Sequence, residues 1–336
     1  MTVLTWDTRQ HAPNGFENAW VARLSRCRLA NFTMDLALVR WEAGRGNHAL
    51  LALVDDGARR AAIVLRETRK GCESGWPWRW QVAIEGPEDA PFAPSHDDAL
   101  WLYERCNALA GGRRLLLHLP LAPAGAAPSF FAGATLVKDM RPAEEEMLKS
   151  LDGNKRRAIN KARRDGYTVT VATTLEQLRV FAELHLVVDA RHGFHTGPLA
   201  ESPGPTEAWR EWEHPWQRLW VAEREGKVVA GSGFGFYPGG MMDYRANAST
   251  PEALKAGANA LLAWEALRQG REAGYRAMNW GGVTTFKQEL RGERIESHCW
   301  LGGGPLWTIP NRAVSASRAA RAKLATLVKS RAAKES

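Results

Sequence analysis

The sequence predicts a two-domain protein of the α/β class with mixed sheets. Its 336 residues exceed the usual size of one domain, and a hydrophobic content of 45% can fill a core in each. Short apolar runs of strand length alternate with longer runs that have helical spacing. The alternation restarts at Pro142, after a loop rich in proline and alanine at residues 120–128. We therefore expect a division of the chain near residue 145.

The first half alternates strand-like and helix-like runs. Apolar runs bounded by glycine and polar residues are typical of strands, and leucines at helical spacing before Gly111 and Gly112 indicate a helix that ends there. The predicted elements are, in order, strands at 34–41, 49–54 and 60–66, a helix at 97–110 and a buried strand at 114–119.

The second half shows a clearer series. A helix begins at Pro142 with three glutamates in its first turn, as a helix N-terminus favours. Asp152 and Gly153 interrupt it. The elements predicted after that are a helix at 155–164 closed by Asp165 and Gly166, a strand at 167–172, a helix at 175–188, a polar loop at 195–217, strands at 219–223, 228–236 and 241–246, a helix at 253–270 and a strand at 277–280.

The charge of the chain points to an anionic partner. The formal net charge is +8 and the pI is about 9.5. A basic balance suits nucleic acid, a phosphorylated substrate or a membrane surface. Two segments concentrate it: residues 154–164 carry six basic side chains and no acid, and residues 311–336 carry seven against one, Glu335.

Several protein classes are disfavoured by the same sequence. No stretch approaches the ~20 apolar residues of a membrane span, and the first residues lack the pattern of a secretory signal. Four scattered cysteines, Cys27, Cys72, Cys106 and Cys299, show no paired spacing, so we expect reduced thiols and no zinc site. The expected location is the cytoplasm.

The basic helix at 155–164 has a cationic stripe. Arg157, Lys161 and Arg164 recur at helical spacing, with Arg156 and Arg163 beside them. Such a stripe can follow a phosphate backbone. It can equally be a solvated face, and the residues alone leave both interpretations open.

Three further features of the sequence bear on ligand binding or catalysis. GSGFGF (231–236) has its glycines inside a strand, which predicts a bulge or close substrate approach and no phosphate loop. The histidines of HGFH (192–195) have no further ligands nearby, so no metal is expected. Asp243 and Glu265 are the candidate general bases, and no nucleophile constellation is present.

The stretch NWGGVTTFKQELRG (279–292) places Phe286 and Lys287 just past two glycines at the end of a strand. Glycines there allow a substrate backbone to approach closely. A lysine at such a place can stabilise an oxyanion or hold a phosphate. The residues are also compatible with a solvated loop lysine and a phenylalanine that packs in the core.

The order of these motifs resembles the Fem family of aminoacyl-tRNA-dependent transferases. The resemblance covers residues 140–295 well and the first 140 in outline. It rests on the ordered strings KRRAINKARRDGYTV, RHGF, KVVAGSGFGF, DYRANAS, EAGY, NWGG and FK. It implies two GNAT-like acyltransferase domains, with a groove between them, at 1–145 and 146–310, and a basic helix at 311–336 that packs back on the first. A single continuous sheet through both halves would contradict this arrangement.

The resemblance also assigns roles to single residues. Phe286 and Lys287 match the family's catalytic pair, with the lysine beside the reacting centre and the phosphates of the tRNA end. Arg191 and Tyr244 match residues that bind the acceptor, and His195 stands where compact members carry a tyrosine. The basic residues 156, 157, 161, 163 and 164 become the expected tRNA contacts. For a lysine of the first domain, Arg23 and Arg26 are the candidates.

The expected function is therefore transfer of an amino acid from aminoacyl-tRNA to an amine, either on a peptidoglycan-precursor peptide or on another small molecule, by a monomer without cofactor. One alternative is a CoA-dependent N-acyltransferase. Its pyrophosphate loop would fall at residues 252–262, which hold only Gly257 and no glycine paired with a basic residue. The other alternative is a non-catalytic RNA-binding module, which leaves the ordered motifs unexplained.

Overall fold

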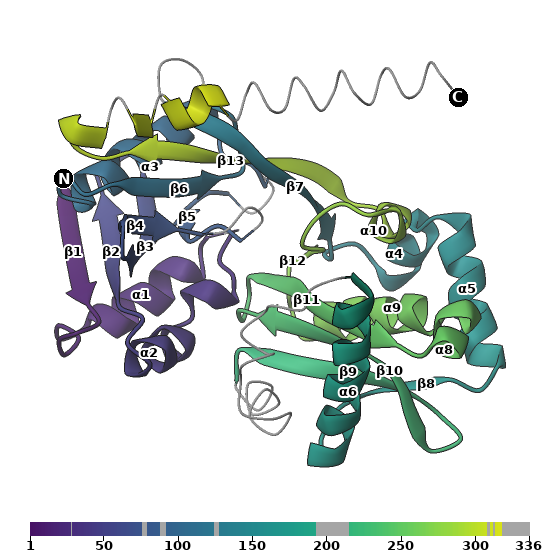
Figure 1. Cartoon of the computed structure of the whole chain (residues 1–336). Helices are drawn as coiled ribbons and strands as arrows, with labels where there is room; N and C mark the ends of the chain where they lie inside the picture. Colours follow the sequence, from purple (N-terminus) through teal and green to yellow (C-terminus); the bar gives the residue numbers. More distant parts are fainter. Residues whose placement is uncertain are drawn as a thin grey trace, which may run out of the picture. The chain divides into compact units, whose positions relative to one another are not determined.

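A computed structural model describes the chain in two compact units (Figure 1). The first unit comprises residues 1–135 and 294–336, and the second comprises residues 136–293. Each is described by itself. The description covers residues 1–336 except 28, 76–78, 88–91, 124–127, 193–214, 308–309, 312 and 318–336, and it leaves out the side chains of 189–192.

The first unit contains a largely antiparallel sheet with helices. Its strand order is β1-β2-β3-β4-β6-β13-β7, with β5 paired to β3, and its parallel pair is β4 with β6. Helix α3 packs on a core that β2, β3 and β6 share. The elements are β1 Thr2–Asp7, α1 Phe16–Leu24, η1 Phe32–Met34, α2 Leu36–Gly44, β2 Ala49–Asp55, β3 Arg60–Thr68, β4 Gly71–Ser74, β5 Val82–Ile84, α3 His96–Leu109, β6 Leu115–Leu119, β7 Ser129–Asp139 and β13 Glu293–Gly302.

The prediction of a strand at 34–41 is wrong. Met34 ends the short helix η1, and helix α2 follows from Leu36. The carboxylate of Asp35 accepts a hydrogen bond of 2.8 Å from the backbone N–H of Ala37 and so caps α2. A short apolar run fits the period of a strand and that of a helix equally well. Here the run forms a helix that buries Leu38 and Val39 on one side.

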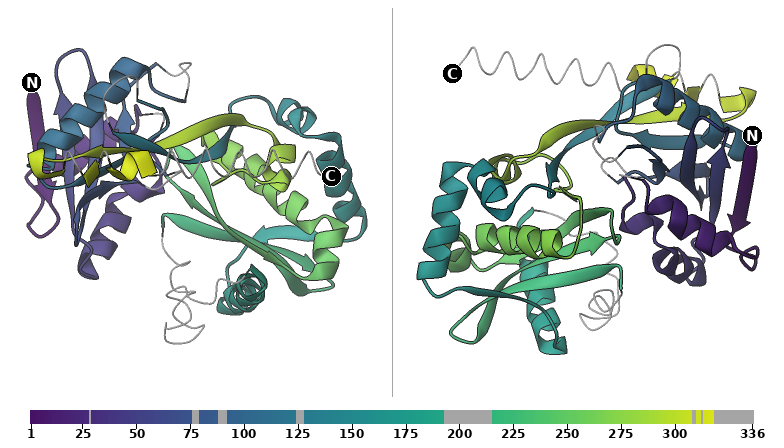
Figure 2. Two further views of the ribbon diagram at one scale, coloured as in Figure 1. Left: turned by 45° about the horizontal axis from the view of Figure 1, so that its top comes forward. Right: turned by 180° about the vertical axis from the view of Figure 1, so that it is seen from behind.

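The second unit has a mixed sheet of strand order β7-β12-β11-β10-β9-β8, in which β11 and β12 run parallel. Helix α6 covers one face and α9 the other (Figures 1 and 2). The elements are α4 Glu144–Ser150, α5 Gly153–Arg164, β8 Thr168–Val171, α6 Leu175–His192, β9 Gln217–Arg224, β10 Lys227–Phe236, β11 Met241–Ser249, α8 Pro251–Ala256, α9 Ala258–Glu272, β12 Ala277–Asn279 and α10 Thr285–Leu290.

Strand β7 is where the two units divide. The first unit ends at Thr135, within this strand, and residues 137–139 pair with β12 of the second unit. The strand order therefore runs unbroken from β1 to β8, which corrects the expectation of a separate sheet in each half. The cause is the length of β7, whose two ends pair in different units. A groove between the units stays a prediction.

Local signals set the ends of α5. The carboxylate of Asp152 accepts from the N–H of Asn154 at 2.9 Å, and Gly166, with φ of 82°, follows the last turn. Ile159 and Ala162 are buried, as their spacing predicts.

Of the C-terminal segment expected to be helical, residues 313–317 are helical, and Ser315 donates a hydrogen bond to the carbonyl of Ser129 in the first unit. Residues 318–336 lie outside the described part.

The predicted helix at 253–270 is divided in two at Gly257. This residue ends α8 and begins α9 with φ of 90°. A Cβ at this position would lie 2.7 Å from the carbonyl oxygen of Ala158 in α5. The glycine thus has two roles: it adopts a left-handed conformation, and it allows α5 to lie against the start of α9.

This double role predicts a graded stability loss. Gly274 also has positive φ, 84°, but a Cβ there would meet nothing within 4 Å. We expect Gly274→Ala to lower the free energy of unfolding by about 1–2 kcal/mol through backbone strain alone. Gly257→Ala adds a steric clash and should cost about 1–3 kcal/mol more. Urea unfolding measures both, and equal losses in the two variants would show that the contact with α5 is unimportant.

Candidate functional site

The turn after β12 carries the lysine that the sequence singled out. Gly281 and Gly282 have φ of 64° and 106°, a conformation that glycine adopts without strain. Thr284 then caps α10 by accepting a hydrogen bond from the N–H of Lys287. Phe286 and Lys287 therefore lie in the first turn of a helix, so Lys287 is not a loop lysine. The ammonium of Lys287 folds back and donates to the carbonyl of Gly281 at 2.7 Å.

Tyr244 of β11 lies beside the same ammonium. The Nζ atom of Lys287 is 5.0 Å from the centroid of the Tyr244 ring, within the range of a cation–π contact. The ring meets Trp280 edge-on at 6.0 Å between centroids. Burial raises the pKa of the Tyr244 phenol, and its hydrogen bond with Ser232 opposes this rise. The phenol is therefore protonated at neutral pH and can serve as a hydrogen-bond donor, not as a base.

A buried amide links the end of β12 to a residue near the start of β11. Asp243 and Asn279 are paired in register and are each 1% exposed. The Nδ2 atom of Asn279 donates to Oδ1 of Asp243 at 2.9 Å, and its Oδ1 accepts from the N–H of Gly281 at 3.0 Å. This pair fixes the point at which the chain leaves the sheet and enters the glycine turn.

The two candidate general bases have different surroundings. Asp243 is next to Tyr244 in the chain and takes part in the buried pair with Asn279. Glu265 lies on α9 and forms ion pairs with Arg163 at 2.8 Å and Arg268 at 2.9 Å. The ion pairs give Glu265 a structural role at the contact of α5 with α9.

The interior glycines of β10 lie opposite a bulge, which is in β11 and not in the glycine-containing strand itself. The register of β10 with β11 shifts between Gly233 and Phe234, where β11 holds one residue more. Nearby, a Cβ at Gly231 would lie 2.5 Å from the ring of Phe181 in α6. Gly231 thus lets α6 pack closely against β10.

Phe286 is held by residues that the sequence did not single out. The ammonium of Lys155 in α5 lies 4.4 Å from the centroid of the Phe286 ring and 2.8 Å from the carboxylate of Glu289. Asp152 adds an ion pair of 3.2 Å with Arg291. Helices α5 and α10 are therefore fastened together next to Lys287. The only signal in the sequence was the excess of basic residues in α5, which does not specify a partner.

The five expected tRNA contacts are exposed on α5, but they are not equivalent. Lys161 pairs with Asp165, and Arg163 pairs with Glu265. This corrects the expectation that no acid compensates the helix, since the partners lie beyond it. Arg156, Arg157 and Arg164 form no ion pair with a carboxylate within the described part of the chain.

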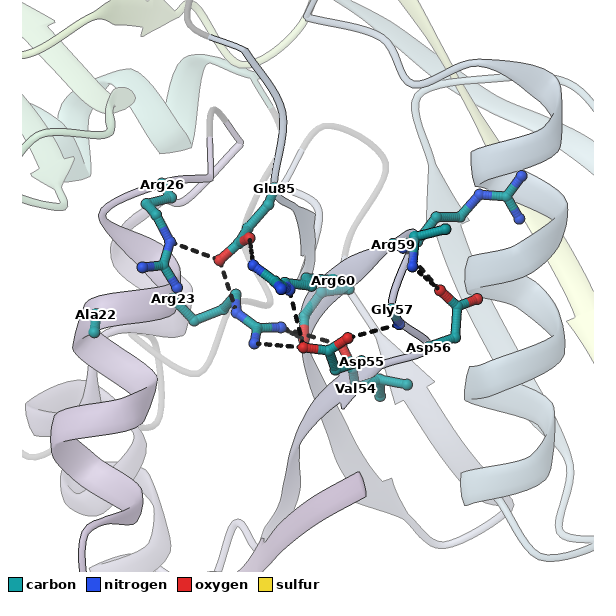
Figure 3. A network of polar contacts seen from close by, with 12 residues as sticks. Ala22, Arg23, Arg26, Val54, Asp55, Asp56, Gly57, Arg59, Arg60 and Glu85 are labelled. Carbon is teal, nitrogen blue, oxygen red and sulfur yellow. Dashed lines mark hydrogen bonds and ion pairs between the residues drawn. The ribbon is translucent and has the colours of Figure 1, made fainter. Parts of the chain in front are cut away.

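The remaining candidates fall in less informative places. Arg191 belongs to α6, but its side chain lies outside the described residues, as does all of His195. In the first unit, Arg23 and Arg26 bind the carboxylate of Glu85 at 2.9 and 2.7 Å (Figure 3). Figure 3 also shows Arg23 directed at the strand end near Asp55. This network occupies both arginines and counts against a role for either in binding substrate.

Three wider features complete the description. The residues that the structure describes contain no group of three or more His, Cys, Asp and Glu side chains that could hold a metal ion. No described helix is both long enough and apolar enough to cross a membrane. All four cysteines are buried.

Comparisons with known proteins agree with this architecture. Residues 149–288, less than half of the chain, match the family model described as acetyltransferase (GNAT) domain. This match indicates acyl transfer as the class of chemistry. No curated protein sequence matches the chain.

Solved structures extend the likeness to both units. The crystal structure of FemX is similar over 93% of this chain and 100% of its own, with a TM-score of 0.62 and 14% identity. A conserved protein of unknown function from Bacteroides thetaiotaomicron is similar over 87% and 98%, with a TM-score of 0.52 and 15% identity. At such identities the likeness establishes the fold, which is that of tandem GNAT-like units in a mixed α/β chain.

Proposed function

We propose that this protein transfers an amino acid from aminoacyl-tRNA to an amine and forms an amide bond. The observation that carries the proposal is the ammonium of Lys287, which the Gly281 carbonyl and the Tyr244 ring hold at the end of β12. The Fem-like motif order and the fold shared with FemX support the same donor. The acceptor is a peptidoglycan-precursor peptide or another small amine.

The proposed reaction needs positioning and charge stabilisation. The acceptor amine attacks the ester carbonyl, a C–N bond forms, the ester C–O bond to the terminal ribose breaks, and the proton lost by the amine ends on the ribose oxygen. The intermediate carries an oxyanion, which a preorganised cation stabilises. Lys287 supplies that cation, or it holds the terminal phosphate of the tRNA. The neutral phenol of Tyr244 can donate a hydrogen bond to the acceptor.

The other proposed contacts follow from exposure and charge. The arginines of α5 that lack a carboxylate partner, 156, 157 and 164, are the strongest candidates for tRNA phosphates. Lys161 and Arg163 would have to exchange an existing ion pair for a phosphate. Arg191 and His195 remain proposed acceptor contacts.

A CoA-dependent acetyltransferase is the second candidate, because the matching family model carries that description. In such an enzyme the pyrophosphate lies against the start of the helix that follows the central hairpin. Here α8 follows the hairpin and α9 follows α8, and Ala158 of α5 lies against Gly257, which ends α8 and caps α9. The packed α5 leaves less room for a pyrophosphate, which favours the aminoacyl-tRNA donor.

Replacement of Lys287 tests the catalytic part of the proposal. Lys287→Met keeps the aliphatic stem and removes the charge, so turnover should fall by roughly 10²–10³, the scale of losing one oxyanion donor, while tRNA binding changes little. Lys287→Arg should also be impaired, because a planar guanidinium does not replace a compact ammonium. The measurement is single-turnover aminoacyl transfer.

Lys255→Met is the matched control, since Lys255 is an exposed lysine on α8 of the same unit. It should transfer at the wild-type rate. Near wild-type transfer by folded Lys287→Met would rule out a catalytic role for this lysine.

Neutralising the arginines of α5 tests the tRNA contact. The triple variant Arg156→Gln, Arg157→Gln and Arg164→Gln should bind tRNA more weakly and with a shallower salt dependence, because each lost phosphate contact reduces the counterions released. A control triple at Arg40, Arg45 and Arg294 changes the net charge equally but lies in the other unit. If both triples weaken binding alike in a salt titration, only the total charge matters and the stripe is a solvated face.

A further inference from the structure

A cationic cavity lies in the first unit and shares no residue with the turn around Lys287. Its volume is about 540 Å³, which falls within the size range of small-molecule sites. Three chain segments line it: the hairpin tip between β3 and β4, the residues before β6, and the turn after β13. The lining residues are Glu67, Thr68, Arg69, Lys70, Gly71, Arg113, Arg114 and Trp307.

Close backbone contacts hold these segments together. The N–H of Cys72 donates to the carbonyl of Arg114 at 2.7 Å, and a Cβ at Gly71 would lie 2.2 Å from that same oxygen. On the other side, the N–H of Gly304 donates to the carbonyl of Gly112 at 3.0 Å. The cavity is therefore built by the fold and does not depend on the position of a single loop.

The side chains that line the cavity carry a net positive charge. Four cationic side chains face one carboxylate, Glu67, and that carboxylate already pairs with Arg113 at 2.6 Å and Arg9 at 3.2 Å. Arg69 and Lys70 occupy the two-residue tip of the hairpin and are exposed. Converging cations of this kind attract a phosphate, and arginine adds a geometry that matches its oxygens.

An aromatic surface completes the site. Trp307 is half-buried, and its indole lies against Gly303, where a Cβ would be 2.8 Å from Cδ1. The guanidinium of Arg114 lies 5.7 Å from the centroid of the indole ring. A tryptophan beside arginines is the arrangement in which proteins stack a base while they bind its phosphate.

We propose that this cavity binds a nucleoside phosphate, with the base on Trp307 and the phosphate among Arg69, Lys70 and Arg114. The ligand is either a free nucleotide or a nucleotide within a single-stranded RNA segment, and both present the same chemistry. The inference does not rest on the proposed function, because a CoA-dependent enzyme with this cavity would bind the same class of ligand.

Binding of two fluorescent probes to the full-length protein tests the inference. One probe is N-methylanthraniloyl-ADP and the other is a fluorescein-labelled oligouridylate of about twelve nucleotides. We expect the double variant Arg69→Gln, Lys70→Gln to weaken binding of the recognised probe at least tenfold, and Trp307→Leu to weaken it about tenfold. Preference for the first probe assigns a free nucleotide, and preference for the second assigns RNA.

Arg45→Gln is the control, because Arg45 is an exposed arginine over another tryptophan, Trp41, at 4.7 Å, outside the cavity. It should bind both probes as the wild type does. The double variant changes exposed side chains at a hairpin tip, so it keeps the test valid if Trp307→Leu fails to fold. Binding that is unchanged in the double variant, or absent for both probes in the wild type, overturns the proposal. Loss in the double variant with full binding by folded Trp307→Leu overturns the stacking of the base.

Discussion

The hydrogen bonds of one buried amide, that of Asn279, determine the geometry of the candidate site. The side chain accepts from the backbone of Gly281 and donates to Asp243 on the neighbouring strand. A buried carboxylate is costly without a donor, so this hydrogen bond holds the end of β12 in register with the start of β11. Because the turn starts from this fixed point, the two glycines with positive φ direct the chain back and bring the ammonium of Lys287 to the carbonyl it contacts.

Two lysines near this turn lie over aromatic rings and have different roles. Lys155 pairs with Glu289 above Phe286 and so joins α5 to α10. Lys287 contacts a backbone carbonyl and the ring of Tyr244, a residue of the central hairpin. Packing of α5 thus supports the turn that carries Lys287 from one side, and its outer face presents the arginines that we propose as tRNA contacts. The same helix lies against Gly257, where a CoA-dependent enzyme needs space.

Sequence reasoning succeeded where the signal is local. Asp152 marks the start of α5, and Asp165 with Gly166 marks its end. The glycines of GSGFGF indicate an irregularity in the pairing with β11. Both signals can be read from sequence because caps and bulges depend on a few neighbouring residues. It failed at 34–41, where one apolar run fits two periods and a capping aspartate decides between them.

Other features could not be predicted because they join residues far apart in the chain. The pairing of Arg163 with Glu265 depends on how α5 meets α9, so the helix looked uncompensated in sequence. Strand β13 follows the segment that matches the acetyltransferase family model but pairs in the first unit, which moves the boundary away from residue 145 and into β7. The roles of Lys287 and Phe286 came from motif order, and the structure adds their contacts.

The proposed function depends above all on the identity of the acyl donor. The most direct measurement incubates the full-length protein and a mixture of amine acceptors with either radiolabelled aminoacyl-tRNA or radiolabelled acetyl-CoA, and follows label into a base-stable amide. If the donor is aminoacyl-tRNA, label leaves the tRNA faster than by spontaneous hydrolysis and enters the amide, while acetyl-CoA yields no product. Acetylation of an acceptor, with the tRNA ester decaying only at its spontaneous rate, would contradict the proposed function.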